Sequence, residues 1–165
     1  GMANHGYNSG HGGKEVRTWE GLGDATDDLA RQVHESCFDP SVIIAIARGG
    51  MVPAGSLTYR LGVKLTDAIN VEFYTDVHQT LPDPVLLAPM LDTDSITGRR
   101  ILIVDDVVDS GRTLALVVKL LRGFGAEVRS AVLYAKPTTV VEPDFCWKHT
   151  DRWIVFPWSA KPPLG

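Results

Sequence analysis

Two continuous apolar runs constrain the fold of this chain more than any other feature. Residues 42–47 read Val-Ile-Ile-Ala-Ile-Ala, and residues 101–104 read Ile-Leu-Ile-Val. A strand with one face in water alternates apolar and polar residues, so an unbroken run indicates a strand that is buried on both faces. Such strands occur in parallel sheets covered by helices. The two runs therefore predict central strands of a parallel sheet.

Helical patterns separate these runs from further strands. The predicted helices cover approximately residues 18–36, 53–61 and 114–124. Thr18 is suited to cap the first of them, and Gly62 to end the second. The further predicted strands are residues 69–73, 128–135 and 153–156. Strands that alternate with helices predict an α/β fold, with a mainly parallel twisted sheet and helices on both faces.

A length of 165 residues suits one domain. Residues 1–14 are rich in Gly, Asn and His, which predicts a disordered tail, and Gly1 before Met2 is typical of an N-terminal tag scar. The domain is expected to cover residues 15–160, with a short tail at 161–165. Residues 75–99 hold several prolines and acids without periodicity, which predicts a long loop of the kind that often forms a lid.

Charge and hydropathy exclude several classes of protein. The formal net charge is -4, and the basic excess typical of a general nucleic-acid binder is absent. No apolar run reaches the roughly 18 residues of a membrane helix, and no apolar signal-peptide core is present. Cys37 and Cys146 do not have metal-ligand spacing. We therefore expect a cytoplasmic protein without nucleic-acid or membrane partners.

The strongest candidate site follows the second apolar run. Asp105 and Asp106 come directly after it, and residues 109–113 read Asp-Ser-Gly-Arg-Thr before a helix. Backbone N–H groups at such a turn can bind a phosphate. The two carboxylates suit ribose hydroxyls, directly or through Mg²⁺. This pattern predicts a site for a ribose 5-phosphate; the alternative is that the acids only cap the following helix.

Residues 101–113 closely resemble the phosphoribosyl pyrophosphate (PRPP) motif of type I phosphoribosyltransferases, and the resemblance extends over residues 15–160. It implies the type I fold with a small hood near residues 75–99. It also implies that Ala47-Arg48-Gly49-Gly50 binds the diphosphate, with the peptide bond after the arginine position cis in some relatives. Asp105 and Asp106 would hold the ribose and Mg²⁺. The residues assigned to PRPP are Arg48, Gly49, Asp105, Asp106, Asp109, Ser110, Gly111, Arg112 and Thr113.

The C-terminal third is similar to the xanthine-guanine and hypoxanthine members of that family. In Tyr134-Ala135-Lys136-Pro137, the resemblance implies that Lys136 donates to the 6-oxo group of a purine. In residues 153–158, it implies that Trp153 stacks on the base and that the carbonyl of Ile154 meets a 2-amino group. The alternatives are a surface lysine and a packing tryptophan. Val155 stands where some bacterial relatives carry an acid, which leaves the preferred oxopurine open.

The resemblance implies a glycosyltransferase of purine salvage. PRPP and guanine, xanthine or hypoxanthine would give a nucleoside monophosphate and pyrophosphate, with Mg²⁺ as cofactor and Asp109 as general acid/base at N7. Relatives form homodimers or homotetramers. Two alternatives stay open: a regulatory protein that binds PRPP or nucleotides with little turnover, and a transferase that uses a pyrimidine or another acceptor.

Overall fold

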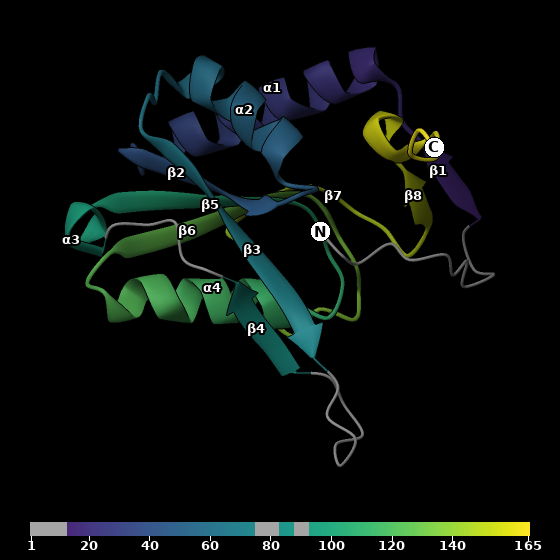
Figure 1. The fold of residues 1–165 in the computed structure, drawn as a ribbon. Coiled ribbons are helices and arrows are strands. Elements are labelled where there is room, and N and C mark those ends of the chain that lie inside the picture. The colour runs from purple at the N-terminus through teal and green to yellow at the C-terminus, as the bar shows by residue number, and fades with distance from the viewer. Residues whose placement is uncertain (1–12, 75–82, 88–92) are drawn as a thin grey trace.

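The computed structural model describes residues 13–74, 83–87 and 93–165. Strands and helices alternate along most of the chain (Figure 1). The elements are β1 (Lys14–Val16), α1 (Trp19–Glu35), β2 (Val42–Ala47), α2 (Met51–Leu61), β3 (Thr66–Tyr74), β4 (Asp83–Leu87), α3 (Thr93–Ile96), β5 (Arg100–Val108), α4 (Arg112–Gly123), β6 (Glu127–Ala135), β7 (Phe145–His149), β8 (Trp153–Val155) and a 3₁₀ helix (Pro157–Ser159).

A six-stranded sheet forms the centre of the molecule, in the order β4-β3-β2-β5-β6-β7. All neighbouring strands are parallel except β3 and β4, which are antiparallel. Figure 1 shows α1 and α2 over one face of this sheet and α4 over the other. The predicted fold class, a mainly parallel sheet between helices, is confirmed.

The hydrophobic core has two layers, one on each face of the sheet. One cluster joins α1 and α2 to the sheet, and the other joins the sheet to α4. Every residue of β2 is buried, as is every residue of β5 after Arg100. Both faces of these two strands are covered, which explains their unbroken apolar runs as the sequence predicts.

The predicted helix ends are also confirmed. The hydroxyl of Thr18 accepts a hydrogen bond from the Gly21 N–H at 3.0 Å and caps α1. Gly62 follows α2 with φ of 68°, a left-handed conformation that glycine adopts without steric cost.

The C-terminal part of the sheet differs from the prediction. Residues 153–155 form a strand, but it pairs with β1 in a separate two-stranded sheet. The edge of the main sheet is instead β7, which the sequence pattern does not predict. Its sequence, Phe-Cys-Trp-Lys-His, becomes more exposed toward its end, so it lacks both a continuous apolar run and strict alternation.

Two predicted segment boundaries also change. Lys14, which the composition assigns to the tail, is the first residue of β1. Within the predicted hood loop at 75–99, residues 83–87 form β4 and residues 93–96 form α3. Pro84 lies in β4 at the sheet edge, the position where a strand tolerates proline. The loop prediction for residues 75–82 and 88–92 lies outside the described residues.

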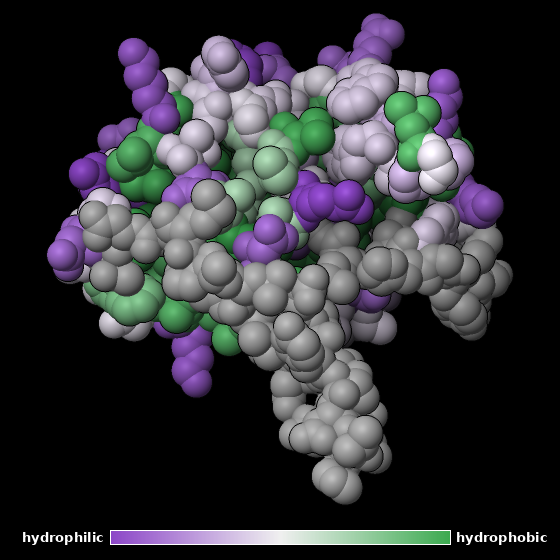
Figure 2. All heavy atoms as spheres, in the orientation of Figure 1, coloured by the Kyte–Doolittle hydropathy of each residue, from purple (hydrophilic) through white to green (hydrophobic). Residues whose placement is uncertain are grey.

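The surface mixes hydrophobic and hydrophilic side chains. Figure 2 shows hydrophobic side chains in separate areas between hydrophilic ones on the face in view. Within the described ranges, no helix is both long enough and apolar enough to cross a membrane.

Candidate active site

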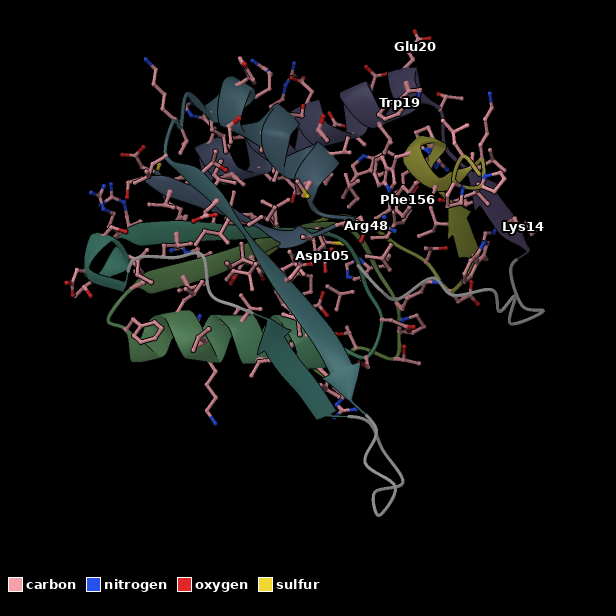
Figure 3. All side chains as sticks on the ribbon, viewed as in Figure 1. Lys14, Trp19, Glu20, Arg48, Asp105 and Phe156 are labelled. Carbon is pink, nitrogen blue, oxygen red and sulfur yellow. The ribbon has the colours of Figure 1, made fainter. Side chains whose placement is uncertain are left out.

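The predicted site residues meet at the carboxyl ends of three adjacent parallel strands. β2, β5 and β6 are neighbours, and the chain continues from them into Arg48, Asp109 and Lys136 respectively. Arg48 and Asp105 lie at the same end of the sheet (Figure 3). In open α/β sheets, ligands bind beyond the carboxyl ends of the strands. The topology therefore gathers these residues where a ligand site is expected.

The loop after β2 is closely packed against β5. A cis peptide bond joins Ala47 to Arg48, so it lies before Arg48, whereas the resemblance implies a cis bond after it. The Arg48 side chain is exposed and has no ion pair with a described residue. At Gly49, a Cβ atom would lie 2.1 Å from an Asp106 carboxylate oxygen. Only glycine lets this loop contact Asp106 so closely.

Gly50 is enclosed by backbone rather than by a side chain. A Cβ atom at Gly50 would lie 2.3 Å from the Val104 carbonyl oxygen and 2.7 Å from that of Ile46. Both are backbone atoms of the central strands, which cannot move aside without disturbing the sheet. Gly55 lies in α2, and a Cβ atom added there would have no neighbouring atom within 4 Å.

We expect Gly50→Ala and Gly55→Ala to change stability in opposite directions. Gly50→Ala should lower the free energy of unfolding by about 1–3 kcal/mol or more, because the added methyl overlaps backbone. Gly55→Ala should raise it by roughly 0.5–1 kcal/mol, since alanine is the better helix residue. Urea unfolding followed by circular dichroism measures both. Equal effects of the two variants would contradict the close approach at Gly50.

Asp105 and Asp106 are strand residues, although the sequence pattern places them in a loop. β5 continues through both to Val108, and their exposed fractions are 3% and 4%. The two buried carboxyl groups nevertheless lie close enough to interact with each other. Asp105 Oδ1 accepts the Asp106 N–H at 2.8 Å, and Asp106 Oδ1 accepts the Val107 N–H at 2.7 Å. These bonds fix the orientation of both carboxylates.

The burial of Asp105 has an electrostatic consequence. Removal from water, together with the neighbouring Asp106 charge, raises the pKa of Asp105 to about 7. The ordinary aspartate pKa is about 3.9. Between these two values, the folded chain keeps a proton that the unfolded chain has lost. The free energy of unfolding of the ligand-free protein therefore falls as the pH rises through this window.

Asp105→Asn is expected to remove this pH dependence. The wild type should lose up to about 1.4 kcal/mol per pH unit relative to the variant between about pH 5 and pH 7. Urea unfolding of both proteins at a series of pH values across this window measures the difference. Asp28→Asn, a substitution at an exposed position of α1, serves as the control and should keep the wild-type slope. Parallel curves for wild type and Asp105→Asn would show that Asp105 titrates normally.

The turn from residue 109 to 113 opens α4. Gly111 is its N-cap, with φ of 85°, and α4 is 12 residues long. Ser110 Oγ accepts the Arg112 N–H at 3.3 Å. The first N–H groups of a helix have no partner within the helix, and the helix dipole favours an anion there. Ser110, Gly111, Arg112 and Thr113 are therefore together at an end of a helix that suits a phosphate.

Residues 138–140, which follow β6, contact this turn. The Val140 N–H donates to the Ser110 carbonyl at 2.9 Å. A Cβ atom at Gly111 would lie 2.5 Å from the Thr139 hydroxyl oxygen. The Thr138 hydroxyl donates to Asp109 Oδ1 at 3.0 Å and lies 3.1 Å from the Asp109 carbonyl oxygen. The sequence pattern does not indicate Thr138, because nothing local distinguishes it from an ordinary loop threonine.

Lys136 connects the phosphate side of the site to the segment predicted to bind a base. Its backbone N–H donates to the Val108 carbonyl at 2.8 Å, and its ammonium donates to the Arg152 carbonyl. Arg152 directly precedes Trp153, which is half-buried, whereas the Ile154 side chain is buried. The structure thus brings the three predicted base-binding residues to one region, although β8 lies outside the main sheet. Their roles in binding stay a prediction.

Comparisons with known proteins agree with this arrangement. The model of the phosphoribosyl transferase domain family matches residues 12–163. A xanthine-guanine phosphoribosyltransferase of Cereibacter sphaeroides is 38% identical over 119 residues, which are 71% of this chain and 68% of the relative. One of Idiomarina loihiensis is 33% identical over 144 residues, 86% of this chain and 84% of the relative.

A solved structure has the same fold over nearly its whole length. The purine phosphoribosyltransferase of Pyrococcus horikoshii is 38% identical, with a TM-score of 0.79. The match covers 92% of this chain and 97% of the other.

Proposed function

Because the chain belongs to the phosphoribosyltransferase family, we propose that it transfers the 5-phosphoribosyl group of PRPP to a 6-oxopurine. The products are a purine nucleoside 5′-monophosphate and pyrophosphate, which is a reaction of purine salvage. The acceptor is guanine, xanthine or hypoxanthine. The relatives named as xanthine-guanine and purine phosphoribosyltransferases support this acceptor class.

The arrangement of this chain's own residues supports the proposal. Two buried carboxylates of β5, the phosphate-binding turn at the start of α4 and the glycine loop after β2 meet at one end of the sheet. PRPP has a ribose between a 5-phosphate and a diphosphate, so it needs these three kinds of partner in one site. The turn would bind the 5-phosphate, and the loop with Arg48 the diphosphate.

The donor set fits Mg²⁺ that arrives with its substrate. Mg²⁺ is bound by one or two protein carboxylates together with substrate phosphates. Asp105 and Asp106 supply two such carboxylates, and among the described residues no group of three His, Cys, Asp or Glu side chains forms a metal cage. Mg²⁺ held there with PRPP would neutralise charge on the departing pyrophosphate.

The remaining residues act on the ribose and the base. The bond between C1 and the pyrophosphate oxygen breaks, and its electron pair leaves with pyrophosphate. A bond forms between C1 and N9 of the purine, while the proton on N7 passes to the Asp109 carboxylate. Thr138 holds that carboxylate in place. Trp153 stacks on the purine, Lys136 donates to its 6-oxo group and the Ile154 carbonyl accepts from a 2-amino group.

Binding of PRPP is the first test. PRPP with Mg²⁺ should raise the melting temperature of the protein, because a ligand that binds only the folded state stabilises it. At about 100 times the dissociation constant, the stabilisation is about 2.7 kcal/mol. Differential scanning fluorimetry measures the shift, with ribose 5-phosphate and Mg²⁺ alone as controls. No binding of PRPP in isothermal titration would remove the basis of the proposal.

Turnover separates the enzyme from the alternatives. Pyrophosphate release is measured with PRPP, Mg²⁺ and each of guanine, xanthine, hypoxanthine, adenine, uracil and orotate. Release with the oxopurines supports the proposal, and release only with a pyrimidine identifies a different acceptor class. Tight PRPP binding without release with any base indicates a regulatory protein. A cytoplasmic location and a homodimeric or homotetrameric assembly remain parts of the proposal, and sedimentation measures the assembly.

A further inference from the structure

The two-stranded sheet carries half of the proposed base site, and it packs on the main sheet through side chains such as Ile154 and Phe156. β8 pairs with β1 in parallel, with Glu15 opposite Ile154 and Lys14 opposite Trp153. Backbone bonds from Arg17 to Val155 and from Trp153 to Gly13 extend this pairing. Neither strand pairs with a strand of the main sheet. Apart from the Thr150 N–H to Ala135 carbonyl bond and the Lys136–Arg152 bond, the position of Trp153 relative to Lys136 depends on side-chain packing.

A largely buried ion pair from β1 and the residue after it supplies such a connection. Glu15 Oε2 lies 3.0 Å from Arg17 Nη2, and the exposed fractions of the two side chains are 19% and 24%. The Arg17 guanidinium lies 5.5 Å from the centre of the Trp147 ring and 6.0 Å from that of Tyr134. Trp147 belongs to β7 and Tyr134 to β6, so the pair lies against two strands of the main sheet.

Tyr134 joins this ion pair to the base site. The side chain is fully buried, and its ring packs edge-on against Trp147 at 5.5 Å. The buried hydroxyl lies beside Glu15, but it makes no hydrogen bond of good geometry with a described residue. Burial and the adjacent Glu15 carboxylate both raise the pKa of Tyr134. Burial alone would raise the pKa of Glu15, but the Tyr134 hydroxyl and Arg17 outweigh it and lower that pKa. The hydroxyl and the carboxylate therefore lie side by side, two residues before Lys136.

A largely buried ion pair between strands carries a cost in desolvation free energy. Removal of two charges from water costs free energy, and apolar side chains of similar size often stabilise a fold as well or better. In some proteins a buried charged contact fixes the relative position of its partners where an apolar contact would not. A site built from two separate sheets needs such a fixed relative position of its two parts.

We propose that Glu15 and Arg17, lodged against Tyr134 and Trp147, are positioning residues that hold β8 at a fixed place relative to β6. The inference rests on the proposed function for its substrate, a 6-oxopurine. Neither residue touches the base. Their contact keeps Trp153 at a fixed position relative to Lys136, while the turn at residues 110–113 and the loop after β2 do not depend on it.

Two substitutions that preserve shape test this role. Glu15→Gln removes the charge, and Tyr134→Phe removes only the hydroxyl. Each should raise the KM for the oxopurine about tenfold and leave the KM for PRPP unchanged, because only the position of β8 is altered. The double variant should not add the two effects, because both substitutions break the same contact. Glu20→Gln, the same change at an exposed position of α1 (Figure 3), is the matched control.

Hydrogen exchange of the ligand-free protein supplies a readout that does not depend on activity. Both variants should exchange faster over residues 13–17 and 150–157, with unchanged exchange over β5. A wild type without oxopurine turnover would contradict the proposed function, and the exchange result would still decide whether the contact holds β8. Unchanged exchange in both variants overturns the inference, as does an equal rise of both KM values, which indicates general loosening of the fold.

Discussion

Asp109→Asn is expected to lower kcat for the oxopurine by roughly 10²- to 10⁴-fold, the usual loss when a general acid or base is removed. Asparagine has the size of aspartate and keeps an oxygen that can accept the Thr138 hydroxyl, so the turn should keep its shape. It has no carboxylate to take a proton from the purine. Affinity for PRPP should change little, because the N–H groups of the turn remain in place.

The measurement must report on the chemical step. Product release or loop motion limits kcat in many enzymes and would hide part of the loss. A rapid-quench experiment with enzyme in excess over PRPP follows one turnover and avoids this problem. Asp24→Asn, at an exposed position of α1, is the matched control. A single-turnover rate equal to that of the wild type would show that Asp109 only shapes the phosphate turn.

Discrimination against adenine is the second large effect that we expect. The Lys136 ammonium has only donors, and one of them is used by the Arg152 carbonyl. The remaining donors suit a 6-oxo group and have no acceptor on a 6-amino group. A buried donor that faces another donor costs on the order of 1–3 kcal/mol, about tenfold to a hundredfold or more in kcat/KM. The wild type should therefore use oxopurines and reject adenine.

Lys136→Ala tests the origin of this preference. The variant should have a much lower kcat/KM for the oxopurine and a smaller ratio between oxopurine and adenine. Competition assays that contain both bases measure the ratio directly. Lys119→Ala, an exposed position on α4, should change neither value. Equal use of adenine by the wild type, or an unchanged ratio in Lys136→Ala, would remove Lys136 from base recognition.

Local patterns along the chain predict the central part of this molecule well. The strands β2 and β5 and the ends of α1 and α2 follow from apolar runs, the Thr18 cap and the left-handed Gly62. These features depend on residues within a few positions of one another. The same holds for the turn at the start of α4, where Ser110, Gly111 and Thr113 are consecutive or nearly so. Most candidate residues of the phosphate side could therefore be named before the fold was known.

Contacts between residues far apart in the chain could not be predicted from local patterns. Local periodicity shows that residues 153–155 form a strand, but only packing shows that β1 is their partner and that β7 takes the sheet edge. The close approach at Gly50 depends on the backbone of β5. The orientation of the Asp109 carboxylate depends on a hydrogen bond from Thr138, 29 residues away. Neither the sequence around Glu15 nor that around Tyr134 predicts that these two residues meet. Preferences for burial, helix or turn are local, so they can be predicted from the sequence alone. Which of these residues meet depends on how the two sheets and their helices pack.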